Sequence, residues 1–285
     1  MNVLVLGDLH LGEDGYAARP HPSWERFAAI LIVGDLAHAR VTVADGGLQR
    51  EELVGLEEAK TFVSQLDDLG VPILSVPGNH DHHCHDAIIS EATQTRGLHR
   101  GTSDFEGVHA FGVGSELLDD GPEVRYEPDA MTGIDDPDAW LARTLDRAVG
   151  GETDAIAALR DRLEEFDRQF STYTERYEVL TDLATASDPN ADRIALTHVP
   201  PFDTTLDRID DAVPRIGGRH WGSIALTNLL ITHDVSFVAC GHIHEGEGVD
   251  TVAGTPCLNA GYRSAYEVTI ENGDVSITDA EPPLE

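Results

Sequence analysis

Five short segments combine glycine or proline with aspartate, asparagine or histidine, whose side chains bind metal ions. They are "GDLH" (7–10), "GDLAH" (34–38), "GNHD" (78–81), "THVPP" (197–201) and "GHIH" (241–244). Each of them follows an apolar run that is typical of a buried strand. In an open α/β sheet, the carboxyl ends of parallel strands form one crevice. We therefore expect these segments to meet at one site, although they are spread over the whole chain.

The candidate ligands in these segments offer carboxylate, amide and imidazole groups and no thiolate. They are Asp8, His10, Asp35, Asn79, His198, His242 and His244. The set is too large for one tetrahedral zinc site and suits two adjacent metal ions that share a carboxylate. Such a bridging carboxylate offsets the repulsion between two cations about 3.5–4 Å apart. Each motif alone is a weak signal, so the prediction depends on all five occurring in order.

The segment "PGNHDHHCHD" (77–86) leaves two kinds of metal site open. A zinc site would use Cys84 together with the histidines beside it. A hard or mixed metal site would instead use Asn79, His80 and Asp81 and leave the other side chains in solvent. The segment by itself does not decide between them.

The chain is strongly acidic, with 52 acidic and 19 basic residues, a net charge of −33 and a single lysine, Lys60. Such a charge repels polyanions at low salt, which argues against unassisted binding to nucleic acid. The acidic residues are spread along the chain, as in proteins of salt-loving archaea, where molar salt screens charges within roughly 3 Å. We therefore interpret the acidity as a solvation device and not as the mark of a cationic ligand.

Three features predict a cytoplasmic protein that does not contact a membrane. The first ten residues contain no basic leader, so we expect no signal peptide. The longest apolar run, "FAAILIVG" (27–34), is too short to span a bilayer. Three cysteines without paired spacing argue against a disulfide framework and fit a reducing compartment.

Alternating strand and helix patterns predict an α/β fold with buried, largely parallel strands. Apolar runs predict strands at 3–6, 29–33, 71–76, 193–196 and 235–239. Helical patterns lie at 48–69, 86–95 and 221–232. Four short runs between residues 248 and 279, separated by glycine and asparagine, predict antiparallel strands.

The pattern changes between residues 115 and 190, which we interpret as an inserted loop and helical cap within one domain of residues 1–285. Residues 115–138 are polar and predict an excursion over the surface. Two helices follow, at 137–149 and 153–184. Apolar residues of the second helix recur three and four positions apart, which predicts a seam between packed helices. A helical hairpin is the favoured interpretation, and a homodimer through helix 153–184 is the alternative.

The order "GDLH…GDLAH…GNHD…THVPP…GHIH" closely resembles the calcineurin-like metallophosphoesterase superfamily over nearly the whole chain, apart from the insertion. The resemblance implies a four-layer α-β-β-α sandwich of two mixed sheets flanked by helices. By motif, it implies that one metal ion is bound by Asp8, His10 and His244, the other by Asn79, His198 and His242, with Asp35 bridging them and His80 as the acid beside the substrate. Residues 82–85 would then begin the next helix, at the rim of the cleft, and Asp81 would brace the loop.

The implied activity is hydrolysis of a phosphomonoester or phosphodiester by in-line attack of a metal-bridging hydroxide. The implied cofactors are two divalent ions, with Mn²⁺ as the first choice and Fe, Ni or Zn as alternatives. We expect a small phosphoester as the substrate. A repair-type DNA nuclease and a non-catalytic metal-binding scaffold are the alternative functions.

One position departs from the pattern of the protein phosphatases in this superfamily. They carry an aspartate three residues after the bridging carboxylate, where this chain has His38. "HLGEDGY" and "GDLAH" are more similar to the branch that includes DNA repair nucleases, in which a histidine at this place faces the substrate. We therefore include His38 with His80 as a candidate catalytic residue, against the alternative of an exposed loop histidine. Against the nuclease we weigh the expectation that the protein has neither the C-terminal extension nor the basic stripe of that branch.

Overall fold

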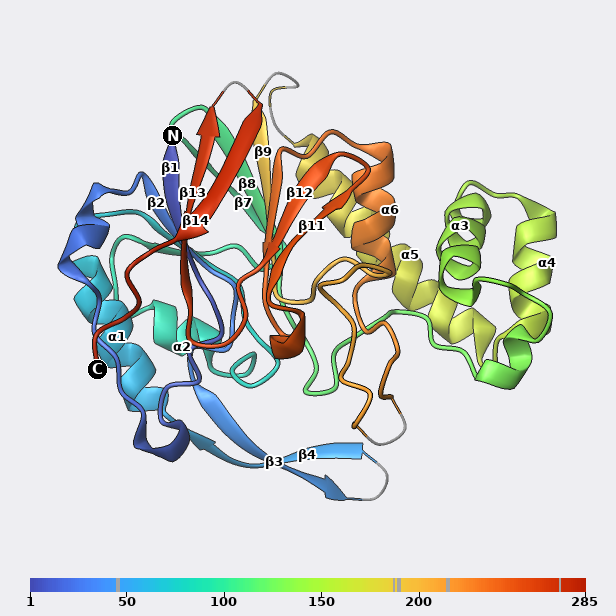
Figure 1. The fold of residues 1–285 in the computed structure, drawn as a ribbon, viewed down its shortest axis with the longest axis horizontal. Coiled ribbons are helices and arrows are strands. Elements are labelled where there is room, and N and C mark those ends of the chain that lie inside the picture. The colour runs from blue at the N-terminus through green and yellow to red at the C-terminus, as the bar shows by residue number, and fades with distance from the viewer. Residues whose placement is uncertain (45–46, 187, 189–190, 214–215, 272) are drawn as a thin grey trace.

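Two six-stranded mixed sheets pack face to face in the computed structural model, which describes residues 1–44, 47–186, 188, 191–213, 216–271 and 273–285. Helices cover the outer faces of both sheets (Figure 1). This is the predicted α/β sandwich of two mixed sheets flanked by helices. Among the described residues, no helix combines the length and the apolar content that crossing a membrane requires.

The first sheet has the strand order β14-β13-β1-β2-β5-β6. Its parallel strands are β1 (Asn2–Leu6), β2 (Ala29–Ile32), β5 (Ile73–Ser75) and β6 (Thr95–Gly97). Its antiparallel strands are β13 (Ala265–Glu271) and β14 (Asp274–Asp279). Helices α1 (Leu56–Asp67) and α2 (His85–Ile89) lie on the same side of the molecule as this sheet (Figure 1).

The second sheet has the order β11-β12-β10-β9-β8-β7. Its strands are β7 (Gly101–Phe105), β8 (Val108–Val113), β9 (Asp192–Thr197), β10 (Phe237–Cys240), β11 (Gly248–Val252) and β12 (Thr255–Asn259). Strands β8, β9, β10 and β12 are parallel, while β7 and β11 pair antiparallel at the edges. Helices α5 (Phe166–Thr185) and α6 (Ile224–Thr232) lie beside this sheet (Figure 1).

Strand β1 shows how the apolar runs build two layers of core. Val3 and Val5 pack into the cluster between the two sheets, whereas Leu4 and Leu6 pack into the cluster that includes helix α1. All four side chains are fully buried. A strand that is covered on both faces has apolar residues at every position and not at alternate ones. The continuous apolar run before each motif therefore indicates a central strand.

The five strands predicted before the motifs are confirmed, as are the four tail strands, although β12 pairs parallel with β10 as well as antiparallel with β11. Helix α3 (Pro137–Val149) has the predicted bounds. The prediction of a helix over 86–95 was too long, because α2 ends at Ile89 and β6 begins at Thr95. The helix predicted over 221–232 begins at Ile224, where Ser223 caps it. Short 3₁₀ turns lie at Glu13–Gly15, Pro22–Arg26, Pro128–Met131 and His244–Gly246.

The prediction of one helix over 48–69 was wrong in its first half. Strands β3 (His38–Ala44) and β4 (Gly47–Val54) form an antiparallel hairpin that extends from the body (Figure 1). Gly55 separates β4 from α1 with a φ of 83°, a conformation that favours glycine. A Cβ at Gly55 would lie 1.6 Å from the main-chain oxygen of Leu11. The hairpin is therefore anchored against the chain that directly follows the first motif.

The helix predicted over 153–184 is divided into α4 (Thr153–Arg162) and α5. Between them, Glu165 takes a left-handed φ of 47°. The predicted seam, including Leu159, Tyr173 and Leu180, is buried against α3 and α6 of the same chain. This packing agrees with the helical hairpin, and the homodimer stays a prediction.

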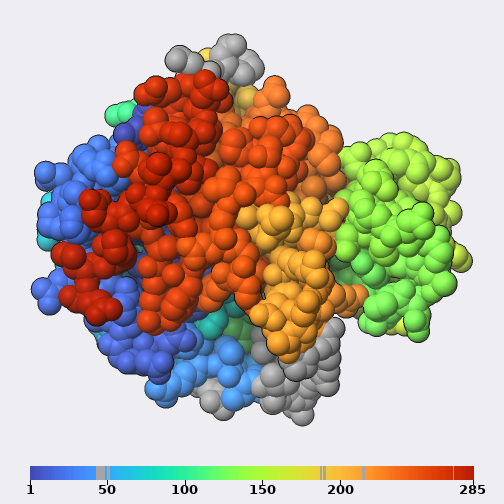
Figure 2. All heavy atoms as spheres, viewed as in Figure 1, coloured from blue at the N-terminus to red at the C-terminus, as the bar shows by residue number. Residues whose placement is uncertain are grey.

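The prediction that residues 115–138 pass over the surface was wrong for their central part. Asp120, Glu123, Val124 and Met131 are buried. Val124 and Met131 belong to the apolar core, and the Glu123 carboxylate accepts hydrogen bonds at the start of α6, including one of 2.8 Å from the Ile224 N–H. Helices α3 and α4 form a lobe at the side of the molecule (Figure 2). A capping role for this lobe stays a prediction.

Candidate metal centre

The five motifs lie at the carboxyl ends of neighbouring strands, three in the first sheet and two in the second. The seven candidate ligands follow β1 (Asp8, His10), β2 (Asp35), β5 (Asn79), β9 (His198) and β10 (His242, His244). Because the two sheets face each other, these loops converge from both sides. Segments separated by more than 200 residues in sequence thus form one cluster, as the motif spacing predicts.

Asp35 lies between the two predicted ligand sets. Its Oδ2 atom is 3.6 Å from Nε2 of His10 and 3.5 Å from Nε2 of His198. In the set of His10, Nε2 of His244 lies 3.3 Å from Oδ2 of Asp8. Asp35 therefore lies where a carboxylate that is shared by two cations would lie.

Asn79 joins the second set through its side-chain oxygen. The Oδ1 atom lies 3.0 Å from Nε2 of His198 and 3.1 Å from Nδ1 of His242. The Nδ2 group points the other way and donates a 3.1 Å hydrogen bond to the main-chain oxygen of Leu118. An amide oxygen and two imidazole nitrogens therefore lie together, which is a donor set that borderline divalent metals accept.

The buried charges of the cluster fit a bound cation. Within the described part of the chain, Asp8 and Asp35 are almost fully buried and form ion pairs only with histidines. In the same part, Oδ1 of Asp8 and Nε2 of His10 are buried without a hydrogen-bond partner. Buried polar atoms without a partner are costly, so both atoms are suited to be ligands. These observations favour divalent metal ions at the site.

Electrostatics leads to the same conclusion. Burial raises the pKa of Asp35, and the neighbouring Asp8 and Asp81 carboxylates raise it further. Burial also lowers the pKa of His242 to about 3, with a further contribution from His198. A divalent cation would favour the ionised carboxylate and the neutral imidazole, which are the forms that bind metal.

Three site residues have left-handed backbone conformations although none is glycine. The φ angles are 46° at His10, 48° at Asp35 and 72° at His242. Such conformations cost about 1–3 kcal/mol each and occur preferentially at functional sites. Each lies in the loop that follows a strand, β1, β2 or β10, where it directs the side chain into the crevice.

The glycines of the motifs provide space for the carboxylates. A Cβ at Gly78 would lie 2.0 Å from Oδ1 of Asp35, and a Cβ at Gly241 would lie 2.3 Å from Oδ1 of Asp8. Neither glycine has a positive φ, so clearance and not backbone conformation explains the residue type. The motifs "GNHD" and "GHIH" therefore need glycine because a carboxylate from another motif packs against it.

Asp81 occupies the bracing position that was predicted for it. Its Oδ1 accepts a 2.8 Å hydrogen bond from the Gly78 N–H, and its Oδ2 accepts one of 2.7 Å from the Leu36 N–H. The carboxylate thus joins the second and third motifs. Burial raises its pKa to about 6.

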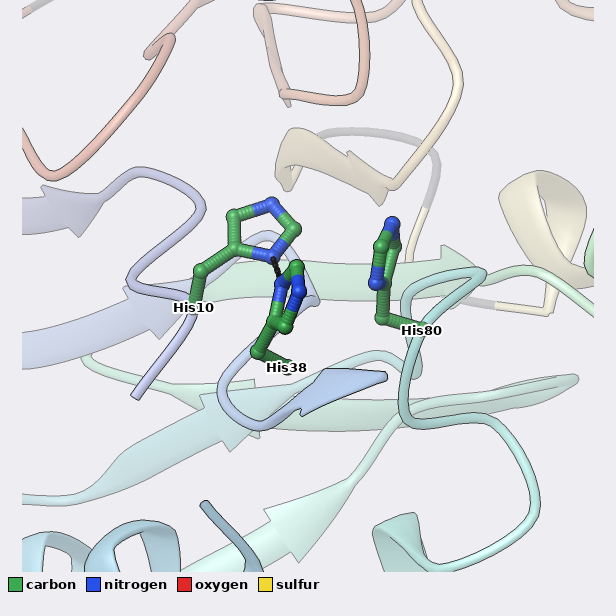
Figure 3. A group of neighbouring side chains, drawn as sticks. All are labelled: His10, His38 and His80. Carbon is green, nitrogen blue, oxygen red and sulfur yellow. Dashed lines mark hydrogen bonds between the residues drawn. The ribbon is translucent and has the colours of Figure 1, made fainter. Parts of the chain in front are cut away.

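Two further histidines, His38 and His80, lie against His10 of the first ligand set (Figure 3). Nδ1 of His10 is 3.1 Å from Nδ1 of His38, and the rings of His38 and His80 are stacked with centroids 4.9 Å apart. His10 thus has one nitrogen facing Asp35 and the other facing His38. Because a ligand histidine is oriented by the partner of its second nitrogen, His38 is suited to orient His10.

The remaining polar residues of "PGNHDHHCHD" lie elsewhere. In the part of the chain that the structure describes, the three-residue groups able to bind metal include none of residues 82–85. Cys84 donates to the main-chain oxygen of Asp81, and His83 is exposed. The prediction of a position at the cleft rim was wrong for His85, which is buried with Nε2 2.9 Å from Oγ of Ser75.

An aromatic residue beside the centre was missed by sequence reasoning. The ring centroid of Tyr262 lies 5.0 Å from that of His244 and 5.7 Å from that of His10. Its hydroxyl donates to Glu13, and the guanidinium of Arg263 lies 4.5 Å from the ring centroid. The segment "NAGYRS" has no metal-binding spacing, so only the pairing of Tyr262 with the Asp8 backbone reveals its place.

Comparisons with known proteins agree with this geometry. Residues 1–246 match the family described as calcineurin-like phosphoesterase. No curated protein matches the chain. Among solved structures, 31 chains are similar to it. One of these, a crystal structure, is 13% identical at a TM-score of 0.54, and the alignment covers 98% of each chain, which shows a shared fold.

Proposed function

Because the chain belongs to the calcineurin-like phosphoesterase family, we propose that it hydrolyses a small phosphomonoester or phosphodiester at a two-metal centre. The observation that carries this proposal is the position of Asp35. Its Oδ2 lies about equally far from Nε2 of His10 and of His198, which belong to different ligand sets. A single metal site would not need a carboxylate between two groups of ligands.

The proposed ligands of the first ion are Asp8, His10 and His244, those of the second are Asn79, His198 and His242, and Asp35 bridges them. Mn²⁺ is the proposed metal, because oxygen and imidazole donors suit it, and Fe, Ni and Zn are the alternatives. When bound, two such ions supply charge neutralisation for the phosphate oxygens and lower the pKa of water.

His80 is the proposed acid for the leaving group. Its Nδ1 lies 3.0 Å from the main-chain oxygen and 3.1 Å from the main-chain nitrogen of Ala39, so Nδ1 faces the backbone and Nε2 is the proposed atom that exchanges a proton with the substrate. Its main-chain N–H donates to Asp35, which fixes the ring beside the centre. Burial, with smaller contributions from His38 and His198, lowers its pKa to about 4. An imidazolium with this pKa is a strong donor, and an anionic substrate would favour its formation.

Metal analysis combined with hydrolysis assays tests the proposal. The purified protein should contain or bind about two equivalents of Mn²⁺ at high salt and hydrolyse a generic phosphomonoester or phosphodiester. Asp35→Asn is the control, because it removes the shared ligand charge and keeps the size of the side chain. A protein that binds no metal and hydrolyses neither ester would contradict the proposal. Metal binding without turnover would favour the scaffold alternative.

A second candidate, a repair-type DNA nuclease, is favoured by one observation. His38 stacks on His80, the proposed acid, and contacts His10, which supports a substrate-facing role for His38 in such a nuclease. Linear DNA should be incubated with the Mn²⁺-loaded protein at low and high salt. Cleavage at high salt that is lost in His38→Asn, with hydrolysis of a small diester retained, would favour the nuclease. If the DNA is not cleaved, the nuclease is excluded and hydrolysis of a small ester remains the proposed function.

Two further proposals concern the cellular location and the oligomeric state of the protein. The three cysteines form no disulfide and support a location in the cytoplasm. A homodimer through residues 153–184 is testable by light scattering at high salt. Only monomer in that measurement would exclude the homodimer.

A further inference from the structure

We propose that Arg176 and Asp120 are positioning residues that orient Asn79 toward the second metal ion. Both belong to the 115–190 insertion, so the insertion would help to orient a ligand of the metal centre. The inference rests on the proposed role of Asn79 as a ligand. It assigns a function to a buried ion pair that the five motifs do not include.

The first step concerns the amide of Asn79. Only its Oδ1 can be a metal ligand, and this atom faces His198 and His242. The opposite Nδ2 group donates to the main-chain oxygen of Leu118. A rotated amide would place the N–H group against the imidazoles and the oxygen against another oxygen. The position of the Leu118 carbonyl therefore determines which atom faces the metal.

The second step concerns what holds the chain directly after Leu118 in place. Asp120, two residues further on, is buried, and its main-chain oxygen accepts a 3.0 Å hydrogen bond from Nε1 of Trp221. Gly121 allows this approach, since a Cβ there would lie 2.5 Å from the same Nε1 atom. The carboxylate of Asp120 lies 3.4 Å from the guanidinium of Arg176.

The third step concerns Arg176 on α5. Its side chain is 17% exposed, and its guanidinium lies between two buried carboxylates, at 3.4 Å from Asp120 and 3.5 Å from Glu123. Glu123 also accepts a 2.6 Å hydrogen bond from Oγ of Ser223 at the start of α6. Removing the Arg176 charge would leave two carboxylates buried without their shared cation. The loop would then move outward, and the Leu118 carbonyl would move with it.

Calorimetric titration with Mn²⁺ at high salt tests the inference without relying on turnover. Asn79→Ala identifies the binding event that belongs to the second ion. In Arg176→Gln, the same event should weaken about 10- to 100-fold, as is typical when the partner of a metal ligand is lost, while the other event changes little. Arg176→Lys keeps the charge and should recover most of the affinity.

Matched controls are available on the same elements. Arg168→Gln removes an arginine of α5 that is 73% exposed and paired with Glu165, and Asp119→Asn removes the exposed neighbour of Asp120. Both should titrate like the parent. If Arg176→Gln does not fold, Asp120→Asn replaces it, with an expected loss of about tenfold against Asp119→Asn.

The outcomes separate the two proposals. Parent protein that binds no Mn²⁺ contradicts the proposed function. Parent protein that binds two ions, with Arg176→Gln or Asp120→Asn binding both as tightly, contradicts the positioning role alone. If Arg168→Gln weakened Mn²⁺ binding as much as Arg176→Gln does, the positioning role would also be contradicted, because loss of a surface charge would then explain the lower affinity.

Discussion

The carboxylate of Asp35 accepts a hydrogen bond of 2.8 Å from the main-chain N–H of His80 through Oδ1. Its other oxygen faces the histidines of both ligand sets. One side chain therefore sets the position of the proposed acid relative to the proposed metal ions. A change at Asp35 is expected to disturb both.

Asp35→Asn should lose both metal binding and hydrolysis. The amide removes one negative charge from between the two ligand sets, and its N–H group replaces an acceptor. We expect metal affinity to fall more than the roughly 10- to 100-fold that loss of an outer partner causes. Bound metal per chain and hydrolysis rate are the measurements. Asp86→Asn, at a fully exposed aspartate, is the control and should match the parent.

His80→Asn should retain metal and lose rate in a way that depends on the leaving group. General acid catalysis typically contributes about 10²–10⁴-fold, and an alkoxide needs the proton more than a nitrophenolate does. We expect a loss of about 100-fold or more for an alkyl ester and a smaller loss for a nitrophenyl ester. His83→Asn, at the exposed neighbouring histidine, is the control. An alkyl ester hydrolysed at the parental rate would refute the acid role.

Gly78→Ala should weaken metal binding through a clash. The added Cβ would lie 2.0 Å from Oδ1 and 2.2 Å from the main-chain N of Asp35, and neither atom has room to move in the buried site. Overpacking of this kind typically costs about 1–3 kcal/mol in stability. Thermal unfolding and Mn²⁺ titration measure both effects. Gly101→Ala is the control, since its nearest contact would be an ordinary 3.6 Å; equal behaviour of the two variants would refute the clash.

His85 should make the protein less stable as the pH falls. Burial lowers its pKa from 6.5 to about 4, so the unfolded chain binds a proton at a pH where the folded chain does not. The stabilising contribution is complete above pH 6.5 and is lost as the pH falls toward 4. The shift corresponds to about 3 kcal/mol.

His85→Gln tests this, because glutamine can bond to Ser75 but does not titrate. Urea unfolding at pH 7.5 and at pH 4.5 should show a smaller loss of stability in the variant than in the parent. His83→Gln is the control at an exposed site. Equal losses in parent and His85→Gln would exclude His85 as the titrating group.

Added salt should stabilise the fold. The net charge of −33 creates repulsion that screening weakens, as the Debye length falls from about 10 Å at 0.1 M to about 3 Å at 1 M. The free energy of unfolding in urea should therefore rise with KCl concentration. Sucrose at matched osmolality is the control, because it stabilises proteins through exclusion from their surface and does not screen charge. A KCl effect no larger than the sucrose effect would contradict a contribution from screening.

The centre was predictable because its chemistry lies in local patterns. Asp35 and Asn79 each lie in the loop that follows an apolar run, and the carboxyl end of a parallel strand is where a crevice forms. Helix α3 was predictable for a similar reason, since Asp136 and Pro137 are start signals within the sequence itself. The hairpin of β3 and β4 was missed because its residues continue into the helical pattern of α1.

Residue types and their order along the chain indicated the family, the strands that precede the five motifs, the tail strands and the candidate metal ligands. Only the tertiary structure decided that Asp35 lies between His10 and His198, that His85 is buried, and that Tyr262 lies beside the centre. The physical reason is that a local sequence pattern reflects interactions between residues that are close in sequence. Distances between loops depend on how the two sheets pack, and that packing is a property of the whole fold.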